Sequence, residues 1–213
     1  MKELLRDGLE RSGLLLEPEV CRALETFLAE LLRWNRRVNL TAISDPAEAV
    51  EKHLVDSLLL LPLLGGATSL LDMGSGAGLP GIPLQLARPE LRVVSVDSVG
   101  KKINFQRHVK RLLGLGRFTP VHARLENLAD ELAQNETFEV VTARAFASLE
   151  LIVQLGAPRR SPAGRILAMK GPEGEAEALA AAKIIADAGL RIERIHKYRL
   201  PFSGAERQVI VLS

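Results

Sequence analysis

The feature that most constrains this chain of 213 residues is a glycine-rich segment that joins a predicted strand to a predicted helix. It reads L-L-D-M-G-S-G-A-G-L-P-G over residues 70–81. Glycines at a strand–loop–helix junction let the backbone come close to a bound ligand. The segment therefore predicts that a parallel sheet starts here and that the loop lies at its ligand-binding edge.

Downstream of residue 65, short apolar runs alternate with longer stretches of helical periodicity. The predicted strands cover residues 69–73, 93–97, 118–122, 138–142, 165–169, 191–199 and 208–212. The predicted helices cover residues 80–86, 101–113, 148–155 and 175–188. The last two strands have no helix between them, so they form a hairpin. By analogy of fold, five βα units and a C-terminal hairpin indicate an α/β chain with the mainly parallel, Rossmann-like sheet of class I S-adenosylmethionine-dependent methyltransferases.

The first part of the chain is expected to be helical. Val20, Leu24, Phe27, Leu28 and Leu31 recur at helical spacing, and a second run from residue 50 to residue 61 repeats the pattern. Pro46, after Ser44 and Asp45, marks the start of that second helix. We predict an N-terminal helical extension over residues 1–64, packed on a methyltransferase-like domain over residues 65–213.

Composition argues against a strongly basic nucleic-acid binder, a disulfide-linked or metal-binding protein and a membrane protein. The net charge of +2 predicts no uniform field for nucleic acid, so any basic surface is local. The single cysteine, Cys21, forms no internal disulfide and lacks the neighbours of a metal site, which favours a cytoplasmic protein without a metal. We find no signal peptide and no membrane span, and a monomer is favoured.

The glycine segment has two interpretations. Gly76, Gly78 and Gly81 match the fingerprint of dinucleotide enzymes, whereas Gly74, Gly76 and Gly78, preceded by Asp72, match that of methyltransferases. Both interpretations expect an acid after the next strand that accepts hydrogen bonds from ribose hydroxyls, and Asp97 is that acid.

Asp72 separates the two interpretations. Its carboxylate is suited to the cationic end of S-adenosylmethionine, directly or through water, and is unfavourable beside a pyrophosphate. It therefore favours a methyltransferase over a nicotinamide-dependent oxidoreductase.

Three later stretches reach the same edge of the sheet. Leu125 and Glu126 follow the third predicted strand, where backbone and apolar contacts to an adenine are expected. Arg144 follows the fourth strand and is suited to bind a carboxylate or phosphate, with Phe146 beside it as a candidate for base stacking. Lys170 ends the fifth strand and is a candidate for contact with a phosphate or a base oxygen.

These motifs together resemble the ribosomal RNA small subunit methyltransferase G family, also called glucose-inhibited division protein B. The resemblance is carried by residues 72–83, by D-S-x-G-K at 97–101, by R-A-F-A-S at 144–148 and by M-K-G at 169–171. Upstream, W-N-x-x-V-N-L-T at 34–41 and K-H-L-x-D-S at 52–57 also match. The resemblance covers nearly the whole chain in the same order.

The resemblance implies cofactor contacts at Gly74, Leu79, Leu125, Glu126 and Arg144. It also implies S-adenosylmethionine-dependent methylation of a guanine N7 in the decoding-region loop of 16S rRNA, within the small ribosomal subunit. Guanine N7 carries a free lone pair, so its methylation needs no general base and depends on alignment and exclusion of water. Arg144 is therefore expected to act by positioning.

Local basic groups are the candidates for RNA contact. Arg33, Arg36 and Arg37 cluster near the end of a predicted helix, and Arg159 and Arg160 form a second group. Arg107, Lys110 and Arg111 share one face of the helix after Asp97.

Two alternatives stay open from the residues alone. The first alternative is an S-adenosylmethionine-binding module for ribosome assembly or metabolite sensing. The second is a methyltransferase with another substrate.

Overall fold

A computed structural model describes residues 1–128, 132–133 and 135–213, and its strands form a seven-stranded sheet in the order β3-β2-β1-β4-β5-β7-β6. The strands are β1 (Ser69–Met73), β2 (Arg92–Asp97), β3 (Phe118–His122), β4 (Phe138–Arg144), β5 (Arg160–Lys170), β6 (Ile192–Arg199) and β7 (Glu206–Leu212). β1 to β5 are parallel, while β7 pairs antiparallel with both β5 and β6. The predicted mainly parallel sheet with a C-terminal hairpin is confirmed.

β1 and β4 are neighbours near the middle of the sheet, and the strand order reverses between them. At such a switch point the loops after neighbouring strands diverge and leave room for a ligand at the carboxyl edge. The glycine segment follows β1 and Arg144 ends β4, so both predicted motifs lie at this position.

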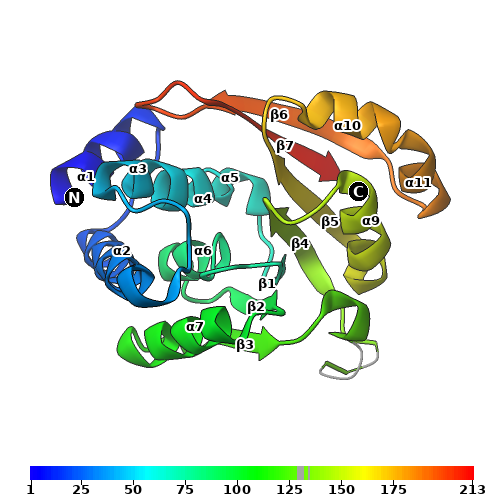
Figure 1. Cartoon of the computed structure of the whole chain (residues 1–213). Helices are drawn as coiled ribbons and strands as arrows, with labels where there is room; N and C mark the ends of the chain where they lie inside the picture. Colours follow the sequence, from blue (N-terminus) through cyan, green and yellow to red (C-terminus); the bar gives the residue numbers. More distant parts are fainter. Residues whose placement is uncertain (129–131, 134) are drawn as a thin grey trace.

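Helices cover both faces of the sheet (Figure 1). One face packs against α6 (Gly81–Ala87) and α7 (Gly100–Leu112), with α2 (Pro18–Val38), α4 (Asp56–Leu58) and α5 (Leu61–Leu64) outside α6 and alongside it. The other face packs against α9 (Leu149–Gly156), α10 (Gly174–Ala180) and α11 (Ala182–Asp187). The remaining helical elements are α1 (Lys2–Arg11), α3 (Pro46–Ala49), the π-helix η1 (Val50–Val55) and the 3₁₀ turns η2 (Leu125–Asn127) and η3 (Ala157–Arg159).

Alternation along the strands produces two apolar cores. Leu70 and Val140 belong to the core under α6, whereas their neighbours Leu71 and Val141 belong to the core under α9. Because successive side chains of a strand point to opposite faces, a strand buried on both sides is apolar throughout. This is why the central strands lack a polar alternation.

The N-terminal helices share the first of these cores. Phe27, Leu54 and Leu58 are fully buried and belong to the same cluster as Leu70 of β1. The helix predicted from Pro46 begins there, and the side chain of Asp45 caps it by accepting from Glu48 N at 2.8 Å. The division of the chain near residue 64 stays a prediction.

Three elements differ from the prediction. The run from residue 50 contains a π-helical turn, Val50–Val55, in place of a regular α-helix. β5 begins at Arg160, five residues before the predicted start, and its register with β4 shifts between the pairs Phe138–Arg160 and Val140–Arg165. The predicted helix over residues 175–188 is broken into α10 and α11 at Ala181, which is buried. In the parts of the chain described, no helix combines the length and apolar character needed to cross a membrane.

Candidate active site

The glycine segment turns tightly between β1 and α6. Gly74 and Gly78 have φ values of +65° and +87°, a region that side-chain-bearing residues rarely adopt. A Cβ on Gly74 would lie 2.1 Å from the ring of Phe146, and a Cβ on Gly78 would lie 2.4 Å from Ile82. Both positions therefore require glycine for conformation and for space.

Asp97 fixes the loop to the end of β2. Its Oδ2 accepts from Gly76 N at 2.8 Å, its Oδ1 accepts from Val99 N at 2.8 Å, and Lys102 Nζ lies 3.7 Å from Oδ2. Each carboxylate oxygen still has acceptor capacity beyond these bonds. Asp97 is thus held in place by backbone donors and keeps lone pairs for hydroxyl groups.

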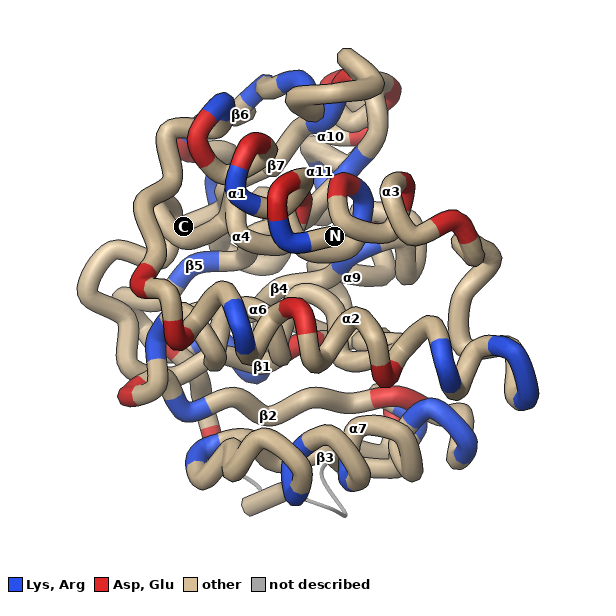
Figure 2. Tube along the Cα trace, turned by 90° about the vertical axis from the view of Figure 1, so that its left-hand side faces the viewer, with Lys and Arg blue, Asp and Glu red and all other residues tan. Residues whose placement is uncertain are grey.

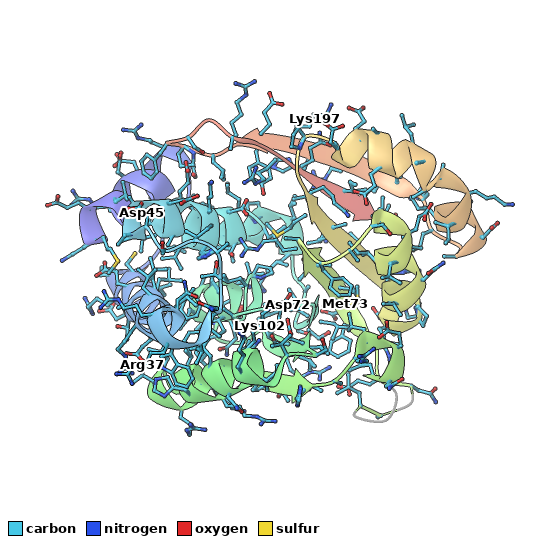
Figure 3. The ribbon with its side chains drawn as sticks, viewed as in Figure 1. Arg37, Asp45, Asp72, Met73, Lys102 and Lys197 are labelled. Atoms are coloured by element: carbon cyan, nitrogen blue, oxygen red, sulfur yellow. The ribbon has the colours of Figure 1, made fainter. Side chains whose placement is uncertain are left out.

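Asp72 lies beneath the loop, fully buried, near the centre of the molecule (Figure 3). Its Oδ2 accepts from Gly81 N at 2.9 Å, and its Oδ1 has no hydrogen-bond partner among the residues that the structure describes. Burial raises the pKa of this carboxyl to about 7, against the Gly81 hydrogen bond and the charge of Arg144, which lower it, while Asp97 adds to the rise. The carboxyl therefore changes its charge near neutral pH.

A cavity of about 440 Å³, here called the loop cavity, opens beside the glycine segment. Four predicted cofactor residues line it: Gly74, Asp97, Leu125 and Glu126. Its wall combines the carboxylate of Asp97 with the apolar side chains of Val96 and Leu125. The other predicted loop residues are not among those that line it: Asp72, Gly76, Gly78 and Leu79. Of these, Asp72 and Gly76 bond to Gly81 and Asp97, respectively.

A second cavity of about 460 Å³, here called the Arg144 cavity, adjoins the loop cavity at Ala145 and Phe146. Arg144 and Lys170 line this cavity and do not line the loop cavity. Ala145 and Phe146 line both. The structure thus divides the predicted site into two neighbouring compartments that share one wall.

Arg144 is anchored in the protein. Its Nη1 donates to the carbonyl of Lys52 at 2.7 Å and lies 3.3 Å from Asp56 Oδ2. The side chain is mostly buried, at 17% exposure. The partners of Arg144 described here, Lys52 and Asp56, belong to the N-terminal helices. Its predicted contact with the cofactor stays a prediction.

Lys170 is anchored too. Its Nζ donates to the carbonyl of Ala147 at 2.6 Å and to Glu177 Oε1 at 2.9 Å, and the side chain is 11% exposed. Glu177 Oε1 also accepts from Leu149 N. Lys170 therefore holds the segment that follows the shared wall, which sequence reasoning did not predict.

His53 and Asp56 line the Arg144 cavity, and the sequence had given neither a role there. His53 Nε2 lies 3.0 Å from Thr41 Oγ1, and burial, with the charge of Arg144, lowers the pKa of the ring to about 4. His53 is therefore neutral at physiological pH. The signal was available, since both residues interrupt an apolar helical run between Val50 and Leu58.

The predicted basic groups differ in accessibility. Arg36, at the exposed end of α2, and Lys102 of α7 line a further cavity of about 740 Å³, and Figure 2 shows basic positions at these two helix ends. Arg37, also exposed, lies at the periphery in Figure 3. Arg159 is buried and donates to the carbonyls of Ala133 and Glu136, so its prediction as an RNA-contacting group is wrong.

Comparisons with known proteins place the chain among RNA methyltransferases. The family model described as rRNA small subunit methyltransferase G matches residues 20–210. The Ribosomal RNA small subunit methyltransferase G of Syntrophotalea carbinolica is 50% identical over 213 residues, covering 100% of this chain and 97% of that protein.

Solved structures share the fold at low sequence identity. Cofactor-bound Rv0187 from MTB has a TM-score of 0.59 at 19% identity and covers 89% of each chain. Aeropyrum pernix fibrillarin, described with natively bound S-adenosyl-L-methionine, has a TM-score of 0.56 at 15% identity and covers 68% of this chain and 66% of its own.

Proposed function

The chain belongs to the rRNA small subunit methyltransferase G family, and on this premise we propose that it methylates N7 of a guanine in the decoding-region loop of bacterial 16S rRNA. The methyl donor is S-adenosylmethionine. The observation that carries the proposal is the pair of neighbouring cavities at the switch point of the sheet, which share Ala145 and Phe146 as lining residues. Two adjoining compartments suit a reaction that brings a donor and an acceptor together.

The loop cavity fits the methyl donor. Asp97 keeps acceptor capacity for two ribose hydroxyls, while Val96 and Leu125 offer apolar contact to a purine. The absence of a Cβ at Gly74 lets the Phe146 ring pack against the backbone of the loop, and both residues line the cavity. S-adenosylmethionine supplies an electrophilic methyl group when it is bound. Predicted contacts at Glu126 and Leu79 belong to the same proposal.

The Arg144 cavity is the proposed acceptor compartment. Its lining combines the Phe146 ring with polar groups that include Thr41 Oγ1 and the neutral His53. A guanine N7 has no proton to lose, so these residues need to orient the base and exclude water. Arg144 and Lys170 act by fixing the wall between the compartments from its two ends.

Contact with the rest of the RNA is assigned to two basic groups at the helix ends, the exposed Arg36 and the partly exposed Lys102. Arg36 and Lys102 lie on a cavity that also includes Thr41, a residue of the acceptor compartment. A phosphate backbone that follows this route would reach the site past two cations. We further propose that the enzyme works as a cytoplasmic monomer on the assembled small subunit.

The test compares transfer of labelled methyl from S-adenosylmethionine to small ribosomal subunits and to naked 16S rRNA, both lacking the modification. We expect labelled subunits, with transfer that declines as salt rises because phosphate contacts weaken. Confirmed cofactor binding without label on either RNA would favour a binding module or a different substrate.

A further inference from the structure

The segment that runs from the π-helix into α4 carries buried polar side chains in an otherwise apolar setting. Asp56 is 4% exposed, and Val55 just before it and Leu58 two residues after it belong to the apolar core. A carboxylate at that depth is unfavourable unless donors compensate for the lost water. The identity of those donors therefore indicates what Asp56 does.

Asp56 joins two segments that are distant in sequence. Its Oδ1 accepts from the hydroxyl of Tyr198, in β6, at 2.8 Å, and its Oδ2 lies 3.3 Å from Nη1 of Arg144, at the end of β4. The same Nη1 donates to the carbonyl of Lys52 in the π-helix. Burial and the neighbouring Asp56 raise the pKa of Tyr198, so its hydroxyl stays protonated and remains a donor.

Arg144 in turn leads directly into the wall between the cavities. Ala145 has a φ of +47°, which a residue with a side chain adopts only when its surroundings impose it. Phe146 follows and lies against Gly74 of the loop. A fixed guanidinium at the start of this turn sets where both residues lie.

We infer that Asp56 and Tyr198 are positioning residues for methyl transfer, because together they hold Arg144 and thereby the Ala145–Phe146 wall that the donor and acceptor compartments share. The inference rests on the proposed function. It assigns a role to the C-terminal hairpin, which reaches the site through one tyrosine. Small displacements matter here, since a misplacement of about 1 Å between reacting groups is enough to cost roughly 100-fold in rate.

The π-helix that precedes Asp56 offers a matched control. Glu51 is also 4% exposed, and its Oε1 accepts from the backbone N–H groups of Phe202 and Ser203 at 2.6 and 2.8 Å. It therefore anchors the same hairpin as Asp56, but it does not line either compartment. Asp56→Asn and Glu51→Gln each replace a buried carboxylate by an amide of equal size.

Three variants test the inference on small ribosomal subunits: Tyr198→Phe, Asp56→Asn and Glu51→Gln. We expect Tyr198→Phe and Asp56→Asn to lower kcat at least about tenfold, with Kd for S-adenosylmethionine within about twofold of the parent. Glu51→Gln is expected to lower the melting temperature and to leave kcat unchanged. Equal losses of kcat in Glu51→Gln and Tyr198→Phe, or unchanged kcat in Tyr198→Phe, would overturn the inference.

Hydrogen exchange gives a readout that does not depend on transfer. In Tyr198→Phe we expect faster exchange of the backbone amides of residues 145–148, whereas in Glu51→Gln the faster amides are those of residues 202–203. Unchanged exchange at 145–148 in Tyr198→Phe would overturn the inference. Absence of transfer by the parent protein would instead refute the proposed function, and exchange would then decide the positioning role.

Discussion

Replacing Asp72 by asparagine should make the folded protein more stable at neutral and alkaline pH. Asp72 is fully buried, and within the described part of the chain one of its oxygens lacks a hydrogen-bond partner. Its pKa is raised from 3.8 to about 7, first by burial. The folded chain therefore keeps a proton that the unfolded chain loses between these values, so the free energy of unfolding falls as pH rises through this window.

The size of the effect follows from the pKa values. Each pKa unit corresponds to about 1.4 kcal/mol, so ionisation of Asp72 destabilises the folded chain by ~4 kcal/mol. An asparagine at this position does not ionise, and its side-chain oxygen can still accept from Gly81 N. We expect the stability of Asp72→Asn relative to the parent to increase by ~4 kcal/mol between about pH 4 and about pH 8.

Urea unfolding without cofactor measures this difference. The single tryptophan, Trp34, packs edge-on against Phe105 at 5.5 Å and serves as the fluorescent reporter. Asp187→Asn, at the exposed end of α11, controls for the loss of one surface carboxylate. If the difference in free energy of unfolding between Asp72→Asn and the parent does not change with pH, burial does not raise the pKa of Asp72.

Three further predictions concern single side chains. His53 contributes the opposite pH dependence, because its pKa falls from 6.5 to about 4. The neutral ring therefore contributes about 3 kcal/mol of stability above pH 6.5, and this contribution is lost as pH falls towards 4. Denaturant unfolding of His53→Gln should lack that loss. Asp97→Ala should weaken S-adenosylmethionine binding at least about tenfold in calorimetry with unchanged circular dichroism, because it removes the hydroxyl acceptor; normal affinity would count against the site. Gly74→Ala should lower the melting temperature and the transfer rate together, because its Cβ would lie 2.1 Å from Phe146; parent-like values of both would contradict this packing.

The fold followed from the sequence because its signals are local. The strand–glycine–helix junction after residue 73 and the apolar runs of the central strands depend on neighbouring residues, and the structure confirms both. The start of β5 did not follow, since Arg160 pairs with Phe138 through an irregular register that depends on the partner strand. The break at Ala181 lies in a run of alanines that contains no helix-breaking residue.

The site was only partly accessible to the same reasoning. Asp97 ends β2 and Leu125 comes shortly after β3, so their place at the sheet edge could be predicted from the sequence. The bonds from Asp56 to Tyr198 and to Arg144 connect residues that are 142 and 88 positions apart, and no local pattern encodes such contacts. Arg159 shows the converse, because a pair of arginines in sequence says nothing about the carbonyls that one of them meets in the fold.

Methylation of guanine N7 is tested by mapping the base that receives labelled methyl on small ribosomal subunits lacking the modification. We predict that the label lies on N7 of a guanine in the decoding-region loop of 16S rRNA, and that Asp97→Ala incorporates less of it at an S-adenosylmethionine concentration near the parent's Kd. Label at another atom, on another RNA or on a protein would contradict the proposed function.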